Sequence, residues 1–360
     1  MDPIVTILAY TTLTLVSTGV VWKGSEMLES SSEKLSVYYR LPPLVQGAIV
    51  TAVGSSFPEL STAVLSTLIH GEFELGVAAI VGSALFNVLM IPALAGLWSK
   101  KELVSTRDLI YKEMQFYLIS IAVLMLVFSF AVIYYPVARP DIAPVLGQVT
   151  RYLALFPLAM YLLYVYLQYQ DTIQHQNDTK DDDVDPRVFE ISPSREGLVL
   201  LGSLVIILVG VEGLVQSAIV FGEVFNTPSF LWGMTIVAAA TSIPDAFVSI
   251  QAARSGNPVA CVANVLGSNI FDLLVCIPAG VLIAGTVVIN YSIAVPMMAM
   301  LTIATLAVLL MMRNQMMLSK QEAWLLIVFY FFFVIWMSIE TFGAVDLIPN
   351  LPPPSSGAGA

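Results

Sequence analysis

The chain has 360 residues, of which 58% are hydrophobic and 11% charged, with a mean hydropathy of +0.84 and a net charge of −11. A soluble domain carries about 25% charged residues, so this composition excludes a water-soluble globular protein and a disordered chain. The negative charge excludes a nucleic-acid binder, because a polyanion would be repelled. We therefore expect a polytopic membrane protein surrounded by a lipid bilayer.

Apolar runs long enough to cross a bilayer recur along the whole chain. A transmembrane helix needs about 20 mainly apolar residues. The runs predict an all-α protein of ten transmembrane helices, over residues 3–22, 42–68, 73–98, 113–135, 148–168, 197–220, 229–253, 258–285, 290–312 and 321–343. Residues 169–196 are predicted to form an acidic loop, and residues 344–360 a disordered tail.

Basic residues fall mainly on one side of this topology. With the N-terminus outside, Arg139 and Arg151 are the only Lys or Arg residues on the outer side, out of 15 in the chain. This positive-inside bias predicts extracellular termini and a cytoplasmic loop 169–196. We expect the protein to lie in the plasma (cell) membrane. The acidic run 181–185 lacks the spacing of an EF-hand, so we interpret it as a solvated linker, with a regulatory Ca2+ site as the alternative.

The two halves of the chain repeat each other. A shift of 186 residues aligns Gly24 with Gly210 and Pro58 with Pro244, and a shift of 185 aligns Ser83 with Ser268. Each half, 1–168 and 197–343, holds five predicted spans, an odd number, so the second half is inverted relative to the first. Inverted repeats that enclose a site near the bilayer midplane are typical of secondary transporters.

The most similar parts of the halves, about 42–98 and 229–285, each contain a proline followed by an acid. The first reads TAVGSSFPELSTAV over residues 51–64 and the second VAAATSIPDAFVSI over residues 237–250. Pro58 and Pro244 are expected to kink or open their helices, which frees carbonyl groups near Gly54 and Ala240. Glu59 and Asp245 follow the prolines, and hydroxyl groups accompany them: Ser55, Ser56, Thr241 and Ser242.

A second repeated motif follows in the next span of each half. It reads VGSALFNVL over residues 81–89 and LGSNIFDLL over residues 266–274. Ser83 and Asn87 are four residues apart, as are Ser268 and Asp272, so each pair shares one helix face. Asn87 and Asp272 occupy equivalent positions, one neutral and one acidic.

The cost of burying these acids indicates what they bind. Glu59, Asp245 and Asp272 together would cost roughly 8–10 kcal/mol at the bilayer centre, with no Lys, Arg or His in the core of the membrane to pair with them. Bound cations or protons must therefore compensate. The ligands are all oxygen, which suits Ca2+, Na+ or K+ rather than Zn2+.

Other polar residues are interpreted more simply. His70 and His175 fall in loops, where we expect them to be solvated. Glu26 and Glu212 are related by the repeat and lie near the ends of their spans, so interfacial placement is favoured over a gating role. Cys261 and Cys276 lie in apolar sequence and imply no disulfide framework.

At the motifs GSSFPELSTA, GSALFN, TSIPDAFVS and GSNIFD the chain resembles the cation/Ca2+ antiporter superfamily, and in particular its sodium/calcium exchangers. The resemblance implies ten helices, four of which hold the site while the first and sixth slide to alternate access. It also implies that the ion ligands are the side chains of Glu59, Asp245, Asp272, Asn87, Ser55, Ser56, Ser83, Thr241, Ser242 and Ser268 and the carbonyl groups of Ala52 and Ala238.

Within the superfamily, Asp245 and the pair GSALFN and GSNIFD are most like the potassium-dependent sodium/calcium exchangers. The expected function is therefore a secondary antiporter, not an enzyme, that exchanges Ca2+ for Na+ without a cofactor. K+ cotransport near Asp272 is a further hypothesis, and a protonated Asp272 is its alternative. A Ca2+/H+ exchanger, a cation channel and an intramembrane aspartyl protease are the competing interpretations, although the motifs depart from the Ca2+/H+ signature.

Overall fold

The computed structural model describes residues 3–39, 52–99, 103–107, 109–137, 145–176, 191–314, 316–345 and 347–348. Within these residues, nine helical segments are long and apolar enough to cross a membrane. The predicted span that is not among these nine is the second in chain order, 42–68, which is described only from Ala52. Its residues 42–51, the acidic run 181–185 and the tail from 349 onward lie outside the described residues. An all-α membrane protein is thus confirmed.

The chain order of elements is the same in the two halves apart from local irregularities. The first half consists of α1 (Pro3–Tyr38), α2 (Ala52–Ser55), α3 (Phe57–Leu68), α4 (Phe73–Trp98), β1 (Leu103–Val104), a π-helical turn (Leu109–Glu113), α5 (Met114–Tyr134), β2 (Leu146–Thr150) and α6 (Arg151–Gln176). The second half consists of α7 (Pro193–Phe225), α8 (Ser229–Trp232), a π-helical turn (Gly233–Val237), α9 (Ala238–Arg254), α10 (Pro258–Phe271), a π-helical turn (Asp272–Cys276), α11 (Ile277–Ala284), β3 (Thr286–Asn290), α12 (Tyr291–Arg313), β4 (Met317–Leu318) and α13 (Lys320–Thr341).

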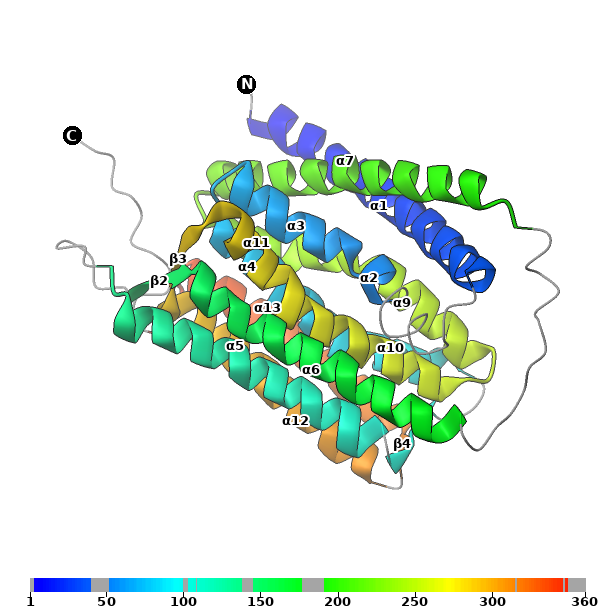
Figure 1. Cartoon of the computed structure of the whole chain (residues 1–360). Coiled ribbons are helices and arrows are strands. Elements are labelled where there is room, and N and C mark those ends of the chain that lie inside the picture. Colours follow the sequence, from blue (N-terminus) through cyan, green and yellow to red (C-terminus); the bar gives the residue numbers. More distant parts are fainter. Residues whose placement is uncertain are drawn as a thin grey trace, which may run out of the picture.

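The helices form three groups that lie side by side (Figure 1). The long helices α1 and α7 pack against each other on one flank, and α5, α6 and α12 lie on the opposite flank. Between them lie α3, α4, α9 and α10, with α4 packed against both α3 and α9. Helix α4 is the most enclosed of the long helices, since 89% of its most apolar stretch is buried. The motifs of both halves therefore lie in the middle of the protein.

Helices α1 and α7 are longer than the sequence predicts. They have 36 and 33 residues, whereas the apolar runs 3–22 and 197–220 mark only their central parts. At 1.5 Å per residue, α1 is about 54 Å long, well beyond the roughly 30 Å of a hydrocarbon core. The apolar run ends at Lys23, but no Gly or Pro stops the helix between Ser25 and Tyr38, so the backbone hydrogen bonds continue into polar sequence.

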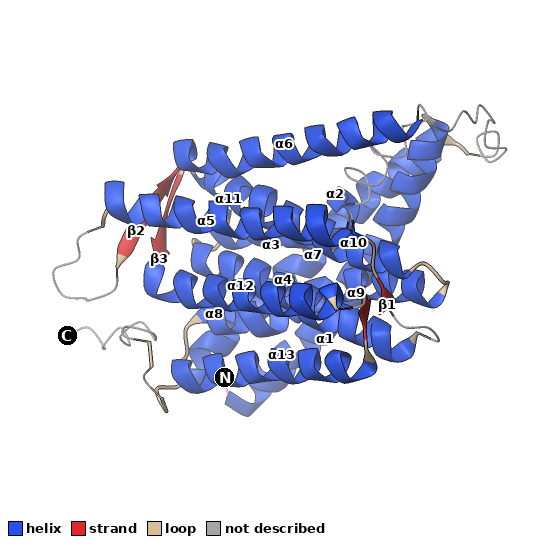
Figure 2. Ribbon diagram, turned by 90° about the horizontal axis from the view of Figure 1, so that it is seen from below, coloured by secondary structure: helices blue, strands red, loops and turns tan. Residues whose placement is uncertain are grey.

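Two short antiparallel sheets, which the sequence did not predict, lie at opposite ends of the bundle (Figure 2). In one sheet β1 pairs with β4, and Leu103 faces Leu318. In the other sheet β2 pairs with β3, from Leu146 opposite Asn290 to Thr150 opposite Thr286. Because β1 pairs with β4, the connection after α4 and the connection before α13 lie on one side of the membrane. Because β2 pairs with β3, the connections before α6 and before α12 lie on the other side. A chain of ten spans that alternate in direction places these four connections on the same sides.

The two prolines act differently. In the first half the helix is interrupted at Ser56: α2 ends at Ser55, and α3 begins at Phe57, the residue before Pro58. By contrast, α9 continues through Pro244, and its irregularity is the π-helical turn at Gly233–Val237. Because Pro244 has no N–H, the Ala240 carbonyl still lacks its usual helical donor, and a kink at Pro244 stays a prediction.

Glycines that the repeat aligns mark where helices come closest. A Cβ atom at Gly24 of α1 would lie 2.7 Å from Cγ1 of Ile207, and one at Gly210 of α7 would lie 2.8 Å from Cγ2 of Val21. Only glycine fits at both positions, as is usual where membrane helices cross closely. The alignment of Gly24 with Gly210 therefore reflects one helix crossing that the two repeats share.

Candidate ion-binding site

The two repeated motifs of each half meet at the centre of the bundle. Helices α3 and α4 bring Glu59, Ser83 and Asn87, and α9 with α10 and the following π-helical turn brings Asp245 and Asp272. All of these side chains are buried, with Glu59 at 1% exposure and both aspartates at 0%. Residues far apart in the sequence therefore form one buried polar cluster, which is called the pocket below.

Glu59 contacts hydroxyl groups from both halves. Ser83 Oγ donates a hydrogen bond to Glu59 Oε1 at 3.1 Å, and the same Ser83 Oγ lies 2.7 Å from Ser242 Oγ. Thr241 also lies beside the Glu59 carboxyl group. Hydroxyl groups thus surround this acid, but only its Oε1 accepts a hydrogen bond, whereas Oε2 has no donor.

Asp245 occupies the equivalent place in the second half. Asn87 Nδ2 donates a hydrogen bond to Asp245 Oδ2 at 3.0 Å. Ser55 and Ser268, whose Oγ atoms are 3.2 Å apart, lie next to the same carboxyl group. Because Ser55 is the repeat counterpart of Thr241, each acid is flanked by a hydroxyl of the opposite half.

Asp272 has the weakest donors of the three acids. Ser56 lies beside it, and the Cys276 thiol is 3.7 Å from Asp272 Oδ1 and 4.0 Å from the carbonyl oxygen of Ser56. From the sequence, Cys276 is expected only to lie in an apolar segment, without a disulfide framework. Its place four residues after Asp272, on the same helix face, was the available signal.

Five buried oxygen atoms in this pocket have no hydrogen-bond partner. They belong to side chains from both halves: Ser56 Oγ, Glu59 Oε2, Asn87 Oδ1, Asp245 Oδ1 and Asp272 Oδ2. In the described part of the chain, no Lys, Arg or His forms an ion pair with these acids. A buried polar atom without a partner is costly, and a cation offers acceptor oxygens the partner that the protein does not provide.

The carboxylates of the pocket do not form a compact cluster of metal ligands by themselves. Among the described residues, no three His, Cys, Asp or Glu side chains lie close enough together to hold a metal ion by themselves. The acids are instead interspersed with hydroxyl and amide oxygens. Of the two backbone positions, Ala52 begins α2, and the carbonyl of Ala238 at the start of α9 accepts a hydrogen bond from Thr241 Oγ1 at 3.3 Å. Such mixed oxygen sites suit hard cations.

Asn269 and Tyr117 belong to the same polar network, and sequence reasoning missed both. Asn269 Oδ1 accepts a hydrogen bond from Asn87 Nδ2 at 3.2 Å, and Asn269 Nδ2 donates one to the Tyr117 hydroxyl at 3.0 Å. Asn269 stands inside the motif GSNIFD, which was a usable signal. Tyr117 lies on α5 outside both motifs, and nothing in the local sequence points to it.

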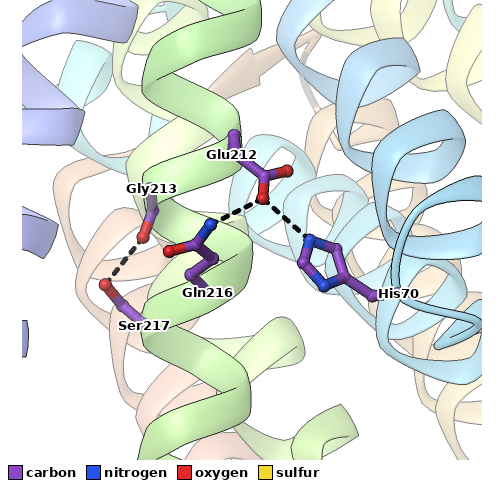
Figure 3. A network of polar contacts seen from close by, with 5 residues as sticks. All are labelled: His70, Glu212, Gly213, Gln216 and Ser217. Carbon is purple, nitrogen blue, oxygen red and sulfur yellow. Dashed lines mark hydrogen bonds and ion pairs between the residues drawn. The ribbon is translucent and has the colours of Figure 1, made fainter.

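His70 is not solvated, contrary to expectation. Its Nε2 lies 2.9 Å from Glu212 Oε1, and Gln216 Nε2 donates to the same oxygen at 2.8 Å (Figure 3). The side chains of His70 and Glu212 are only 19% and 28% exposed. Glu26, the repeat counterpart of Glu212, instead pairs with Lys23 on its own helix. The His175 side chain lies outside the described residues.

Comparison with known proteins gives a family for this fold and pocket. The family model described as sodium/calcium exchanger protein matches residues 9–170 and 196–339. The chain belongs to the sodium/calcium exchanger family. This confirms the resemblance of the four motifs and makes the protein a secondary transporter rather than an enzyme.

Individual relatives are more distant. The chain is 26% identical to the inner membrane protein YrbG of Escherichia coli over 270 residues, 74% of this chain and 77% of that protein. It is 24% identical to the sodium/calcium exchanger MaX1 of Methanosarcina acetivorans, over 70% of this chain and 76% of that protein. A shorter stretch of 61 residues is 41% identical to the human sodium/potassium/calcium exchanger 5, covering 17% of this chain and 12% of that protein.

Solved structures share the fold. A structure of the sodium-calcium exchanger NCX_Mj soaked with Na+ and Sr2+ has a TM-score of 0.58 and 20% identity, and covers 92% of this chain and 98% of its own. A crystal structure of the H+/Ca2+ exchanger CAX has a TM-score of 0.67 and 16% identity, and covers 91% of this chain and 82% of its own. The predicted architecture of two inverted repeats is thereby confirmed.

Proposed function

We propose that this protein exchanges Ca2+ for Na+ across the membrane, and that both ions bind in the pocket between the repeats. The observation that carries the proposal is the set of five buried acceptor oxygens without partners, contributed by both halves. Ca2+ takes about 6–8 oxygen ligands from carboxylates, amides, hydroxyls and carbonyls. The proposed side-chain ligands are Glu59, Asp245, Asp272, Asn87, Ser55, Ser56, Ser83, Thr241, Ser242 and Ser268, and the proposed carbonyl ligands are those of Ala52 and Ala238.

Charge balance supports a divalent cation or several monovalent ones. Three ionised carboxylates would leave an uncompensated charge of −3 in a pocket without Lys, Arg or His among the described residues that face it. Ca2+ neutralises two of these charges, and two or three Na+ ions neutralise a similar number. Because both cases use the same oxygens, occupation by Ca2+ and by Na+ should exclude each other, which is the requirement for exchange.

Alternating access would use the pair α1 and α7. These helices pack on each other at Gly24 and Gly210, and Lys34 Nζ of α1 lies 3.3 Å from Glu196 Oε2 of α7. They can therefore move as one body over α3, α4, α9 and α10, which carry the ligands. We infer that this sliding opens the pocket to one side at a time, with both termini extracellular in the orientation that the basic residues favour.

K+ is proposed to be cotransported with Ca2+ near Asp272. A monovalent cation there would neutralise the third charge, and the short match to a sodium/potassium/calcium exchanger is in line with it. The alternative is a protonated Asp272. A Ca2+/H+ exchanger is the second candidate function, favoured by the fold shared with CAX, whereas the paired motifs favour Na+.

Flux measurements in proteoliposomes test the proposal. Purified protein is reconstituted with Na+ inside, and the uptake of radioactive Ca2+ is followed in four external conditions: with and without a Na+ gradient, and with and without K+. We expect uptake only with an outward Na+ gradient and stimulation by K+. Uptake driven equally well by a proton gradient in the absence of Na+ would contradict Na+ coupling. Uptake independent of any counter-ion gradient would indicate a channel.

A further inference from the structure

Asn269 of α10 adjoins the proposed ligand Asn87 but is not itself among the proposed ligands. Its side chain is fully buried, and its hydrogen bonds cross from the second half to α4 and α5 of the first half. We propose that Asn269 is a positioning residue, which fixes the orientation of the Asn87 amide so that Asn87 Oδ1 faces the bound cation. This inference rests on the proposed function, because the cation concerned is the proposed Ca2+.

Both N–H groups of the Asn87 side chain donate hydrogen bonds. A side-chain amide has two N–H donors on nitrogen and one acceptor oxygen. Asn87 Nδ2 donates to Asp245 Oδ2 at 3.0 Å and to Asn269 Oδ1 at 3.2 Å. Asn87 Oδ1 is left buried without a partner. The two donated bonds therefore decide which end of the amide is available as a cation ligand.

Asn269 is held in one orientation by partners of its own. Its Nδ2 donates to the carbonyl oxygen of Ala84 at 3.0 Å and to the Tyr117 hydroxyl at 3.0 Å. If Asn269 were flipped, its oxygen would face the Ala84 carbonyl and its NH2 group would face the NH2 group of Asn87. Both contacts would be repulsive, whereas the Tyr117 hydroxyl can donate or accept. The Ala84 carbonyl therefore fixes Asn269, and Asn269 fixes Asn87.

The repeat explains why only the second half carries this residue. At a shift of 185 residues, Asn269 corresponds to Ala84, and Asp272 corresponds to Asn87. A carboxylate has two equivalent acceptor oxygens and no N–H to direct, so Asp272 needs no orienting neighbour. Asn87 has distinguishable ends and does need one. The difference between Ala84 and Asn269 is thus the counterpart of the difference between Asn87 and Asp272.

The test compares four variants of the full chain with the wild type in detergent: Asn269→Ala, Asn87→Asp, the double variant, and the control Asn264→Ala. Asn264 lies on the same helix and donates to Ser249 Oγ at 2.9 Å, outside the pocket. The readouts are the melting temperature without ions and the Ca2+ concentration that gives half of the maximal Ca2+-induced rise in melting temperature. Loss of a residue that orients a metal ligand typically weakens metal binding about 10–100-fold.

We expect Asn269→Ala to raise the half-maximal Ca2+ concentration about ten-fold or more, and Asn264→Ala to leave it unchanged. In the Asn87→Asp background, Asn269→Ala should have little further effect, since no amide is left to orient. An equal effect in both backgrounds, or a lower melting temperature with an unchanged Ca2+ midpoint, would overturn the positioning role. If the wild type shows no Ca2+-induced rise, the proposed function fails. In that case the melting temperatures without ions test the contact between Asn87 and Asn269. If the decreases caused by Asn269→Ala and Asn87→Asp add up in the double variant, the two residues are not coupled and the positioning role is contradicted. If they do not add up, the coupling is supported.

Discussion

The two repeats contribute equivalent helices but different side chains to one pocket. In the second half, Asp245 has a strong amide donor, because Asn87 bonds its Oδ2 at 3.0 Å. In the first half, Glu59 has a serine hydroxyl at 3.1 Å. Asp272, the acid that replaces an asparagine, has a thiol at 3.7 Å and the Ser56 hydroxyl beside it. The protein therefore provides the weakest measured donor to Asp272, so a cation in the proposed site would stabilise this acid most.

The largest expected effect comes from the acid of the first half. Glu59→Gln keeps an oxygen that accepts from Ser83 but removes one negative charge from the proposed Ca2+ site. We expect Na+-dependent Ca2+ uptake to fall at least about 100-fold, while the melting temperature of the purified protein stays near that of the wild type. Uptake in proteoliposomes measures the loss.

Glu26→Gln is the matched control for this charge change. Glu26 is exposed on α1 and paired with Lys23, far in sequence from the motifs. It should therefore retain wild-type uptake. Near wild-type uptake in Glu59→Gln itself would remove Glu59 from the proposed ligands.

A second large effect concerns the packing of the two repeats against each other. A Cβ atom at Gly82 of α4 would collide with the carbonyl oxygen of Met234 and lie 2.8 Å from Cβ of Ala238. Neither atom belongs to a flexible side chain, so the helices must separate. Gly82→Ala should destabilise the protein by about 1–3 kcal/mol, measured by thermal unfolding in detergent.

Gly202 of α7 provides the comparison, since a Cβ atom there meets no atom within 4 Å in the part of the chain that the structure describes. Gly202→Ala should leave the melting temperature unchanged or raise it, because alanine favours the helix. Equal destabilisation by the two substitutions would contradict the close contact of α4 with the start of α9.

A more selective effect is expected at Asp272, where the repeats differ. Asp272→Asn makes the second half like the first and removes the third charge of the pocket. If K+ is bound there, Ca2+ uptake should persist but lose its stimulation by K+. Equal uptake by the wild type with and without K+ on both sides would show instead that Asp272 is protonated or belongs to a Na+ site.

The smallest effect is expected outside the pocket, where His70 joins the turn after α3 to Glu212 of α7 (Figure 3). The equivalent acid Glu26 forms its ion pair within α1, with Lys23. Nearby acids already have other partners: Glu72 accepts from Ser229, and Glu74 accepts from the backbone N–H of Asn290.

His70→Ala removes this contact and should destabilise the protein by about 0.5–1.5 kcal/mol, the usual net value of one hydrogen bond. Thermal unfolding in detergent measures the change. An unchanged melting temperature would show that the contact between His70 and Glu212 does not stabilise the protein.

The sequence was informative where chemistry is concentrated in local motifs. The ten spans, the inverted repeat and the acids Glu59, Asp245 and Asp272 follow from hydropathy and from the cost of burying charge. Contacts between distant segments were missed, because the pairing of His70 with Glu212 or of Asn269 with Tyr117 has no local signature. The ends of α1 were missed for another reason. Hydropathy records where the apolar run stops, whereas backbone hydrogen bonds continue until a breaking residue stops them.

We propose that one pocket shared by the repeats binds Ca2+ and Na+ in turn, and competition between the two ions is the direct test. Ca2+ binding to the purified protein is measured by equilibrium titration at increasing Na+ concentrations. The shared oxygens of Glu59, Asp245 and Asp272 predict that Na+ weakens Ca2+ binding competitively, with an unchanged maximal occupancy. Simultaneous saturable binding of both ions, with no effect of one on the other, would contradict it.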